Sequence, residues 1–379
     1  MATENNNKNL NVPNLRFPEF HKPYSSTTIS KLATIVGGGT PDTTVPDYWN
    51  GGIQWFTPSE IGKNKYTNKS ERTISQEGLN NSSAKLLPIN TILLSTRATI
   101  GESSIAKAEC CTNQGFQSLI ANEEIVCYEY LYYLVATLKK ELIRKSCGST
   151  FLEISANEVR KIKTFVPSLE EQGKVSSLLS LIDERIATQI KIIEKLESLI
   201  KGLCQKLFRF DECTTYFLGD ICSITTGKLD ANAMVENGKY PFFTCAEEVF
   251  NIDNYAFDTE ALLISGNGAN LGYIHYYNGK FNAYQRTYVL DKFTIDINYI
   301  RLYLETFLKN RIEQEKNIGN TPYIVLGTLS KMKIKVPNIL TQQKIVKTLT
   351  SFKNKLSNER LALKKYEEQK KYLLSNLFI

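Results

Sequence analysis

The chain has 379 residues, of which 42% are apolar, and its mean hydropathy is −0.25. This length and composition indicate a globular protein of roughly two or three domains and argue against a disordered chain. The sequence has no run of about 18 apolar residues, and its first ten residues, MATENNNKNL, are polar. We therefore expect neither a membrane span nor a signal peptide.

The cysteines and histidines argue against a metal site. The eight cysteines form no C-x-x-C pair, and the chain has two histidines, His21 and His275. Zinc sites need Cys and His at short, characteristic spacings, so we expect no metal here. Thiols without a pattern are typical of a reducing compartment, and we expect a cytoplasmic protein.

The charge is unevenly distributed along the chain. The net charge is +7, and counting by region gives +3 for residues 1–165, +1 for 166–209, −3 for 210–335 and +6 for 336–379. The basic excess thus lies mainly in the last segment, where a solvated helix face explains it as well as nucleic acid does. Charge alone identifies neither globular region as a DNA binder.

In chain order, the first region is residues 1–165. It mixes short runs of Ile, Val, Leu, Phe and Tyr with Gly and Asn turns, and has a helical pattern around 128–145. A long helix is predicted over 166–209. Ser168 and Glu171 have the S-x-x-E spacing of a capping box, which starts this helix.

The second half of the chain repeats the first. Residues 210–335 follow the same order of elements, with a helical pattern around 297–316, and 336–379 repeat the long helix with Asn338 as its N-cap. The long helices match at a constant offset of 170 residues. We therefore predict an α+β protein in which two mixed α/β domains form a tandem repeat. The matching blocks are ISKLATIVGGG with LGDICSITTGK, QWFTPSE with PFFTCAE, ILLSTRATIG with LLISGNGANLG, TNQGFQSLI with AYQRTYVLD, and EYLYYL with NYIRLY.

Both long helices carry a coiled-coil seam. Apolar residues recur at steps of four and three from Val175 to Leu207 and again over the equivalent residues of the second helix. Two helices of equal length and phase are expected to pack antiparallel, giving a pseudo-two-fold repeat with one domain at each end. Gln189 and Glu359 share a seam position near the helix middles, and we expect them to meet and fix the register.

Catalytic motifs are missing from the sequence. GGGT (37–40) and SGNGANLG (265–272) match neither glycine pattern of nucleotide-binding proteins and are interpreted as turns or as loops that approach a phosphate. NTPY (320–323) differs by one residue from the N-P-P-Y motif of adenine methyltransferases, and a turn before a strand is the favoured interpretation. With two histidines, a Ser/His/Asp triad is not expected. This absence favours a binding protein.

The chain resembles the specificity subunits of type I restriction–modification systems in NLRFPEF (14–20), KLATIVGGGTPD (31–42), VPSLEEQGKVSSLLSLIDERI (166–186), KLESLIKGLCQKLF (195–208) and LLSNLF (373–378). The resemblance implies two target recognition domains, each reading one half of a split double-stranded DNA target, and two antiparallel helices that set the spacing. The implied partners are two modification subunits, which use S-adenosylmethionine to methylate adenine N6, and restriction subunits, which use ATP and Mg. This chain itself would hold no cofactor and catalyse no reaction.

Base edges are read by side chains on loops, Arg or Lys with guanine and Asn or Gln with adenine. Gln114 and Gln285 share a repeat position and are the favoured pair, although an ordinary exposed loop position is the simpler interpretation of any single candidate. The predicted DNA-binding residues are Gly38, Gly39, Thr40, Thr57, Ser59, Lys63, Lys65, Arg97, Asn113 and Gln114 in the first domain, and Lys228, Thr244, Asn267, Asn270, Gln285 and Arg286 in the second.

Two other functions stay open at this point. An enzyme with its own methyltransferase or nuclease activity would need a cofactor motif. A structural coiled-coil adaptor would not bind DNA, which an electrophoretic shift assay with the modification subunit would reveal.

Overall fold

The computed structural model describes residues 11–148, 152–315 and 323–379. It contains two compact units, unit 1 (Met1–Ile190 with Leu361–Ile379) and unit 2 (Lys191–Arg360). Both divisions fall inside long helices, so each unit holds a globular part and one half of each helix. The domain boundaries predicted at the helix ends stay predictions.

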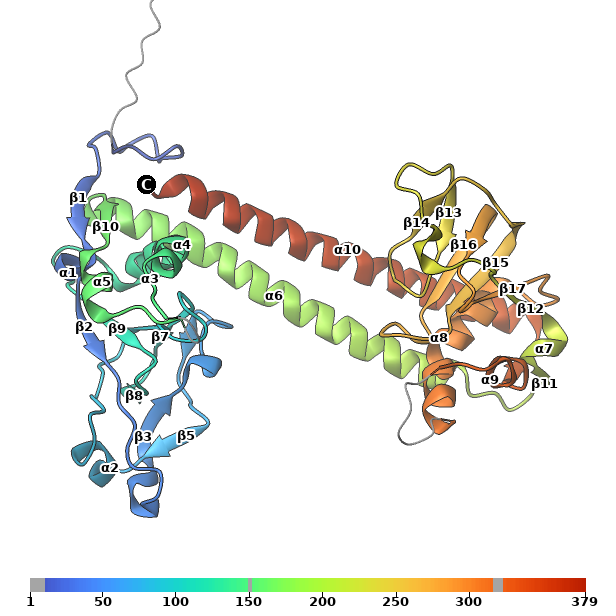
Figure 1. Cartoon of the computed structure of the whole chain (residues 1–379), viewed down its shortest axis with the longest axis horizontal. Helices are drawn as coiled ribbons and strands as arrows, with labels where there is room; N and C mark the ends of the chain where they lie inside the picture. Colours follow the sequence, from blue (N-terminus) through green and yellow to red (C-terminus); the bar gives the residue numbers. More distant parts are fainter. Residues whose placement is uncertain (1–10, 149–151, 316–322) are drawn as a thin grey trace, which may run out of the picture. The chain divides into compact units, whose positions relative to one another are not determined.

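The strands of unit 1 form three sheets (Figure 1). Their strand orders are β2-β9-β6-β7-β4, β5-β3-β8 and β1-β10. Most neighbours are antiparallel, but β3–β8 and β4–β7 are parallel. Helices α3 and α4 occupy the region where one helix was predicted. The elements are β1 (Ser25–Thr28), α1 (Ile29–Leu32), β2 (Ala33–Gly37), β3 (Trp49–Phe56), β4 (Tyr66–Thr67), β5 (Arg72–Ile74), α2 (Gln76–Asn80), β6 (Ile92–Leu94), β7 (Ser103–Ala106), β8 (Cys110–Thr112), β9 (Gln117–Ala121), α3 (Tyr128–Thr137), α4 (Lys139–Arg144), α5 (Ala156–Lys161) and β10 (Lys163–Val166).

Unit 2 repeats this plan with a larger single sheet, ordered β12-β17-β15-β16-β13-β14, beside the pair β11-β18. The parallel pair β13–β16 corresponds to β3–β8 of unit 1. Helix α8 lies where the sequence predicts a helix. The elements are β11 (Thr214–Phe217), α7 (Leu218–Ile221), β12 (Ser223–Thr226), β13 (Tyr240–Phe243), β14 (Phe250–Ile252), β15 (Phe257–Ser265), β16 (Ile274–Ala283), β17 (Thr287–Asp291), α8 (Ile297–Gln314), α9 (Leu326–Ser330) and β18 (Lys333–Val336).

The two long helices are α6 (Leu169–Leu207) and α10 (Ile339–Leu377), each of 39 residues. Both begin where the sequence places a cap. The Ser168 hydroxyl accepts a hydrogen bond from the Glu171 amide at 3.4 Å, and the Asn338 side chain accepts one from the Thr341 amide at 2.9 Å. These bonds satisfy amides that the first helical turn leaves without a partner.

The predicted seam is the face of these helices that packs inward. Val175 and Leu179 of α6, and Ile345 and Leu349 of α10, are all at most 2% exposed. Most helical stability in proteins comes from burying such an apolar stripe. The 3.5-residue repeat therefore predicted the packed face correctly.

Side-chain pairs show that the helices run antiparallel within unit 1 and pack on each other in unit 2. In unit 1, Asp183 pairs with Lys370 at 2.7 Å, and the Arg185 guanidinium lies 5.4 Å from the centre of the Tyr366 ring. In unit 2, Glu197 pairs with Arg360 at 2.6 Å. The predicted direction is confirmed.

The predicted contact between Gln189 and Glu359 concerns both units. Gln189 belongs to unit 1 and is 7% exposed, whereas Glu359 belongs to unit 2 and is half-buried. Their role in fixing the register stays a prediction.

Each unit closes its core on the C-terminal end of a long helix. In unit 1, Phe378 packs against Tyr130 of α3 with ring centres 5.0 Å apart. In unit 2, Phe208 packs against Tyr299 of α8 at 5.9 Å, and also against Tyr303. The two phenylalanines are 170 residues apart and the two tyrosines 169, so both cores use the same aromatic contact.

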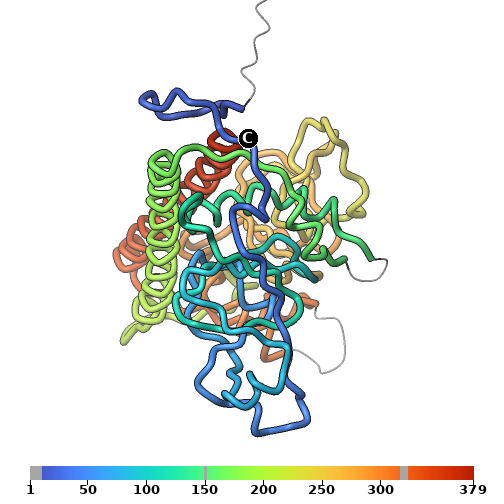
Figure 2. The backbone as a smooth tube through the Cα atoms, turned by 90° about the vertical axis from the view of Figure 1, so that its left-hand side faces the viewer, coloured from blue at the N-terminus to red at the C-terminus, as the bar shows by residue number. Residues whose placement is uncertain are grey.

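The N-terminal segment of unit 1 lies beside the end of α10 (Figure 2). The Leu15 amide donates to the Asn376 carbonyl at 2.9 Å. Arg16 reaches α6, where its Nε and Nη2 donate to the two oxygens of Glu171, each at 2.8 Å. The carboxylate predicted to close a capping box thus forms an ion pair with the segment NLRFPEF.

Candidate nucleic-acid interface

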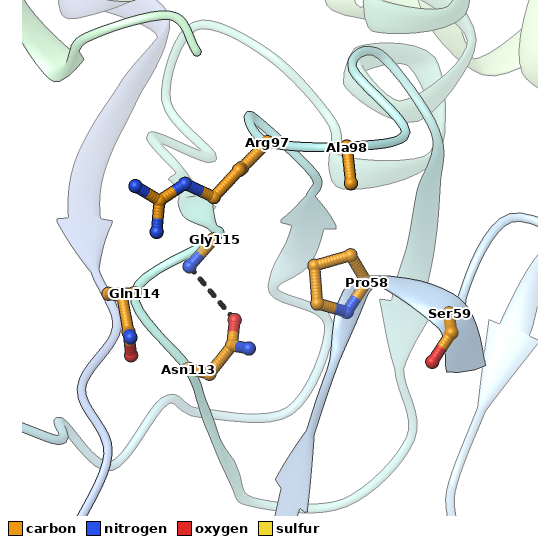
Figure 3. A pocket seen from close by; sticks show the side chains of 7 residues that line it. All are labelled: Pro58, Ser59, Arg97, Ala98, Asn113, Gln114 and Gly115. Carbon is orange, nitrogen blue, oxygen red and sulfur yellow. Dashed lines mark hydrogen bonds between the residues drawn. The ribbon is translucent and has the colours of Figure 1, made fainter. Parts of the chain in front are cut away.

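Three loops of unit 1 surround a shallow pocket of about 300 Å³ (Figure 3). We call this group cradle 1: residues 57–60 after β3, 95–102 between β6 and β7, and 113–116 between β8 and β9. The pocket is lined by Pro58, Ser59, Arg97, Ala98, Asn113, Gln114 and Gly115. Its polar groups face an open surface, which suits a ligand that approaches from outside the domain.

Backbone hydrogen bonds hold the loops of cradle 1 together. The Thr96 amide donates to the Gly115 carbonyl at 2.8 Å, and the Asn113 amide donates to the Phe56 carbonyl at 3.1 Å. The Asn113 side-chain oxygen accepts from the Gly115 amide at 2.8 Å, as Figure 3 shows. This bond uses one of the two acceptor sites of that oxygen and fixes the direction of the Asn113 side-chain amide.

A glycine-rich segment packs directly on the back of cradle 1. A Cβ at Gly38 would lie 2.0 Å from the Asn113 carbonyl oxygen, so this backbone approach excludes any side chain. Next to it, the Thr40 hydroxyl donates to the Gln114 side-chain oxygen at 2.5 Å. GGGT is therefore a support that positions the 113–116 loop.

Arg97 is held in place by an ion pair. Its Nη2 lies 3.1 Å from a Glu153 oxygen, and both side chains are about half exposed, at 47% and 40%. An exposed pair of this kind adds little stability. It does, however, restrict where the guanidinium can point.

Unit 2 builds the same frame from residues 244–247, 265–273 and 284–287, which we call cradle 2. The Gly266 amide donates to the Arg286 carbonyl at 2.9 Å, as Thr96 does to Gly115. The Tyr284 amide donates to the Phe243 carbonyl at 2.9 Å, as Asn113 does to Phe56. These two bonds align the cradles residue by residue.

The glutamine of cradle 2 is fixed at the same position as in cradle 1, but by a different hydrogen bond. Gln285 donates to the Asp230 carboxylate at 2.7 Å, whereas Gln114 accepts from Thr40. A Cβ at Gly227 would lie 1.9 Å from the Ala283 carbonyl oxygen, so Gly227 takes the place of Gly38. Both glutamines are exposed and fixed at the same point of the frame.

In unit 1 the structure brings most predicted residues together. The predicted residues that belong to cradle 1 or to the segment that supports it are Gly38, Gly39, Thr40, Thr57, Ser59, Arg97, Asn113 and Gln114. Lys63 is exposed on the chain that leaves the first loop.

Lys65 differs from the prediction that it lies on an exposed loop. Its side chain is 9% exposed, and its Nζ lies 3.4 Å from Glu129 of α3 and 2.6 Å from the Ser180 hydroxyl of α6. Burial lowers the pKa of this lysine, and Glu129 opposes the shift. Lys65 therefore ties the sheet to α3 and α6 inside unit 1.

In unit 2 the predicted residues again gather at the cradle. The loops of cradle 2 carry Asn267, Gln285 and Arg286, and Lys228 follows Gly227 in the supporting segment. The Asn270 side chain donates a hydrogen bond to the Cys245 carbonyl at 3.3 Å. Thr244 is 6% exposed, and its hydroxyl accepts from the Ala246 amide at 3.2 Å. Thr244 thus supports the loop and is too buried to face a ligand.

Sequence reasoning missed some members of the cradles. Glu153 lies 56 positions from its partner Arg97, and the sequence gives no sign of this contact. Ala98 adopts a positive φ of +64°, and the equivalent Gly268 has φ +80°. The alignment of Ala98 with a glycine in the repeat could have indicated this left-handed backbone. In NTPY, residues 320–322 lie outside the described residues, and Tyr323 forms a bridge with Asn267.

The described residues contain neither a candidate metal site nor a candidate membrane helix. Within residues 11–148, 152–315 and 323–379, no three His, Cys, Asp or Glu side chains are grouped so that they could hold a metal ion. In the same part of the chain, no helix has the length and apolarity needed to cross a bilayer.

Known sequences show which proteins this chain is similar to. A model of the type I restriction modification DNA specificity domain matches residues 22–198 and again 211–365. The chain is 28% identical over 361 residues to the type I restriction enzyme MjaIX specificity subunit of Methanocaldococcus jannaschii, with 83% of each chain covered. It is 43% identical over 136 residues to the EcoDI specificity subunit of Escherichia coli, which covers 36% of this chain and 30% of that protein.

Solved structures share the fold. The S subunit of a type I restriction–modification system from M. genitalium superposes with a TM-score of 0.65 at 20% identity, covering 97% of this chain and 99% of that one. A chain from a study of complex assembly in the type I R-M system superposes with a TM-score of 0.60 at 17% identity, covering 95% and 99%.

Proposed function

The chain belongs to the family of type I restriction–modification specificity subunits, the non-catalytic DNA-specificity components of these enzymes, and from this premise we propose how its parts divide the work. Each unit reads one half of a bipartite DNA target through its cradle. The helices α6 and α10 set the spacing between the halves and dock two modification subunits.

The repeated cradle frame is the observation that carries this proposal. Cradles 1 and 2 share their backbone hydrogen bonds and a fixed glutamine, but they carry different side chains at the surrounding positions. Two cradles with the same backbone hydrogen bonds but different exposed side chains suit two different base sequences, because base identity is read by side-chain donors and acceptors.

The partners follow from the family. We infer that modification subunits with S-adenosylmethionine methylate adenine N6 in the target and that restriction subunits use ATP and Mg to move along and cleave DNA. This chain would supply no cofactor to either reaction. It would act in the cytoplasm, where the DNA is.

Methylome sequencing of a host that expresses this chain with its modification subunit tests the proposal. We expect methylated adenines within one motif of two short specified blocks separated by an unspecified spacer. An electrophoretic shift assay with the purified complex should show tighter binding to that motif than to scrambled DNA, by at least about 10³-fold. Methylation in a single uninterrupted motif, or none that depends on this chain, would contradict bipartite reading.

Exposed apolar side chains support docking on the helices. Leu181 of α6 is 63% exposed, and Leu361 and Tyr372 of α10 are 53% and 60% exposed. Apolar side chains at the centre of a protein interface become buried on binding, so we base the proposed docking surface on these three residues.

Changing Leu181 to Lys is expected to weaken binding of the modification subunit about tenfold or more without affecting folding, because a charge would be buried in the interface. Size-exclusion chromatography and calorimetric titration with the modification subunit measure this. Leu86→Lys is the matched control, since Leu86 is 45% exposed in the globular part of unit 1. Equal binding by both variants would remove Leu181 from the docking surface.

A further inference from the structure

The two cradle glutamines are held by chemically different partners. Gln285 Nε2 donates to an Asp230 oxygen at 2.7 Å, whereas the Gln114 side-chain oxygen accepts from the Thr40 hydroxyl at 2.5 Å. A carboxylate only accepts hydrogen bonds, so Asp230 can pair only with the nitrogen of the Gln285 amide. A hydroxyl can donate or accept, so Thr40 can hold either end of the Gln114 amide. Of the two glutamines, Gln285 is therefore the one whose amide direction is dictated by its partner.

The main chain of cradle 2 holds Asp230 beside Gln285. The Gln285 main-chain amide donates to the Leu229 carbonyl at 2.9 Å, and Leu229 forms a parallel bridge with Tyr284. On its other side, the Asp230 carbonyl accepts from the Ala233 amide at 3.1 Å. Both side chains are exposed, but these bonds fix the main chain from which each of them extends. The hydrogen bond between the two side chains is therefore part of the frame of cradle 2.

This hydrogen bond leaves a defined set of polar groups on Gln285. A glutamine amide has two N–H donors and an oxygen with two acceptor sites. Asp230 occupies one donor, so one N–H and the oxygen remain for a base. Along its major-groove edge, adenine presents the N6 amino donor and the N7 acceptor, which match this remaining pair. Guanine presents two acceptors there, O6 and N7, so the Gln285 oxygen would face an acceptor.

We propose that Asp230 is a positioning residue that makes unit 2 require adenine, and reject guanine, at the base that Gln285 contacts. This inference rests on the proposed function. Thr40 imposes no direction on the Gln114 amide, so we expect the base that Gln114 contacts to be read without discrimination between the two purines. The two glutamines then have different specificities because of the side chains that hold them.

The full chain with its modification subunit provides the test, by methylome sequencing and by binding to duplexes with single base changes. Gln285→Ala identifies the base position, because it removes the contact. At that position the wild-type protein should prefer adenine to guanine, and Asp230→Ala should lower this preference by roughly 5- to 150-fold. The double variant should discriminate no less than Gln285→Ala alone, because Asp230 acts through Gln285. Asp253→Ala, which changes an exposed aspartate of unit 2 outside the cradle, is the control and should leave the motif unchanged.

A duplex with an adenine analogue that lacks the N6 amino group gives a second readout. Placed at the position that Gln285 contacts, the analogue should weaken binding of the wild-type protein, because the Gln285 oxygen loses its donor. Gln285→Ala should bind the analogue and the adenine duplex equally well. A variant with a damaged fold would instead lose affinity for every duplex, and circular dichroism identifies it.

The outcomes separate this inference from the function on which it rests. A wild-type protein without a bipartite motif would remove the proposed function itself. A bipartite motif in which Gln285→Ala relaxes no position, or in which Asp230→Ala keeps the full preference for adenine, would overturn only the inference. A change of affinity that is uniform across sequences after Asp230→Ala would also overturn it, because that is the effect of a charge acting on phosphates.

Discussion

Replacing Arg16 with leucine is expected to lower the free energy of unfolding by about 3–5 kcal/mol. The side chain of its partner Glu171 is 2% exposed, and the two form a bidentate pair with both contacts at 2.8 Å. Without Arg16, a buried carboxylate loses its counter-charge beside Tyr24, whose hydroxyl lies 3.3 Å away. Burial and this carboxylate both raise the pKa of Tyr24, so its hydroxyl stays neutral and offers the carboxylate a hydrogen bond but no counter-charge. Urea-induced unfolding followed by circular dichroism measures the change.

A matched series of arginine variants separates the effect of burial on stability from the effect of charge. Arg144→Leu removes an exposed arginine that pairs with Glu141 and should cost no more than about 1 kcal/mol. The double variant Arg16→Leu with Glu171→Leu should recover much of the loss, because a buried pair replaced by apolar side chains is often tolerated. A loss below about 1 kcal/mol for Arg16→Leu alone would mean that water reaches Glu171.

Lengthening both long helices by four residues is expected to lengthen the unspecified DNA spacer by one or two base pairs. Four helical residues advance by about 6 Å and turn by about 40° beyond a full turn. One base pair of DNA advances by about 3.4 Å and turns by about 36°. The added rise therefore corresponds to about 1.8 base pairs and the added rotation to about 1.1 base pairs, so we expect a change of one or two. Methylome sequencing reads the new spacer directly.

Two further variants control this experiment. Changing Lys364 and Lys365 to alanine alters exposed residues of α10 at constant length and should leave the spacer unchanged. Inserting the four residues into α6 alone moves half of its seam out of register and should lower stability. An unchanged spacer in the variant with both insertions would defeat the idea that the helices measure distance.

Features with a regular period could be predicted from sequence. The seam residues Val175 and Leu179 are buried because a 3.5-residue repeat leaves one stripe to pack. The helix starts at Ser168 and Asn338 could be predicted because capping depends on residues three positions away. The equivalence of Gln114 and Gln285 could be predicted because the repeat supplies its own internal alignment.

Contacts between distant residues could not be predicted. Lys65 has the composition of a surface lysine, but its partners Glu129 and Ser180 lie 64 and 115 positions further along the chain. Arg16 and Glu171 are 155 positions apart, and Glu171 was assigned to the nearest cap instead.

The closure of each core on a helix end sets an order for folding during synthesis. The core of unit 2 uses Phe208 and extends to Leu349, so all its residues have been translated before Leu373 of unit 1. The core of unit 1 includes Leu373, Leu377 and Phe378. The globular part that the ribosome makes first is therefore the last to be completed, and until then Tyr130 lacks the ring that covers it.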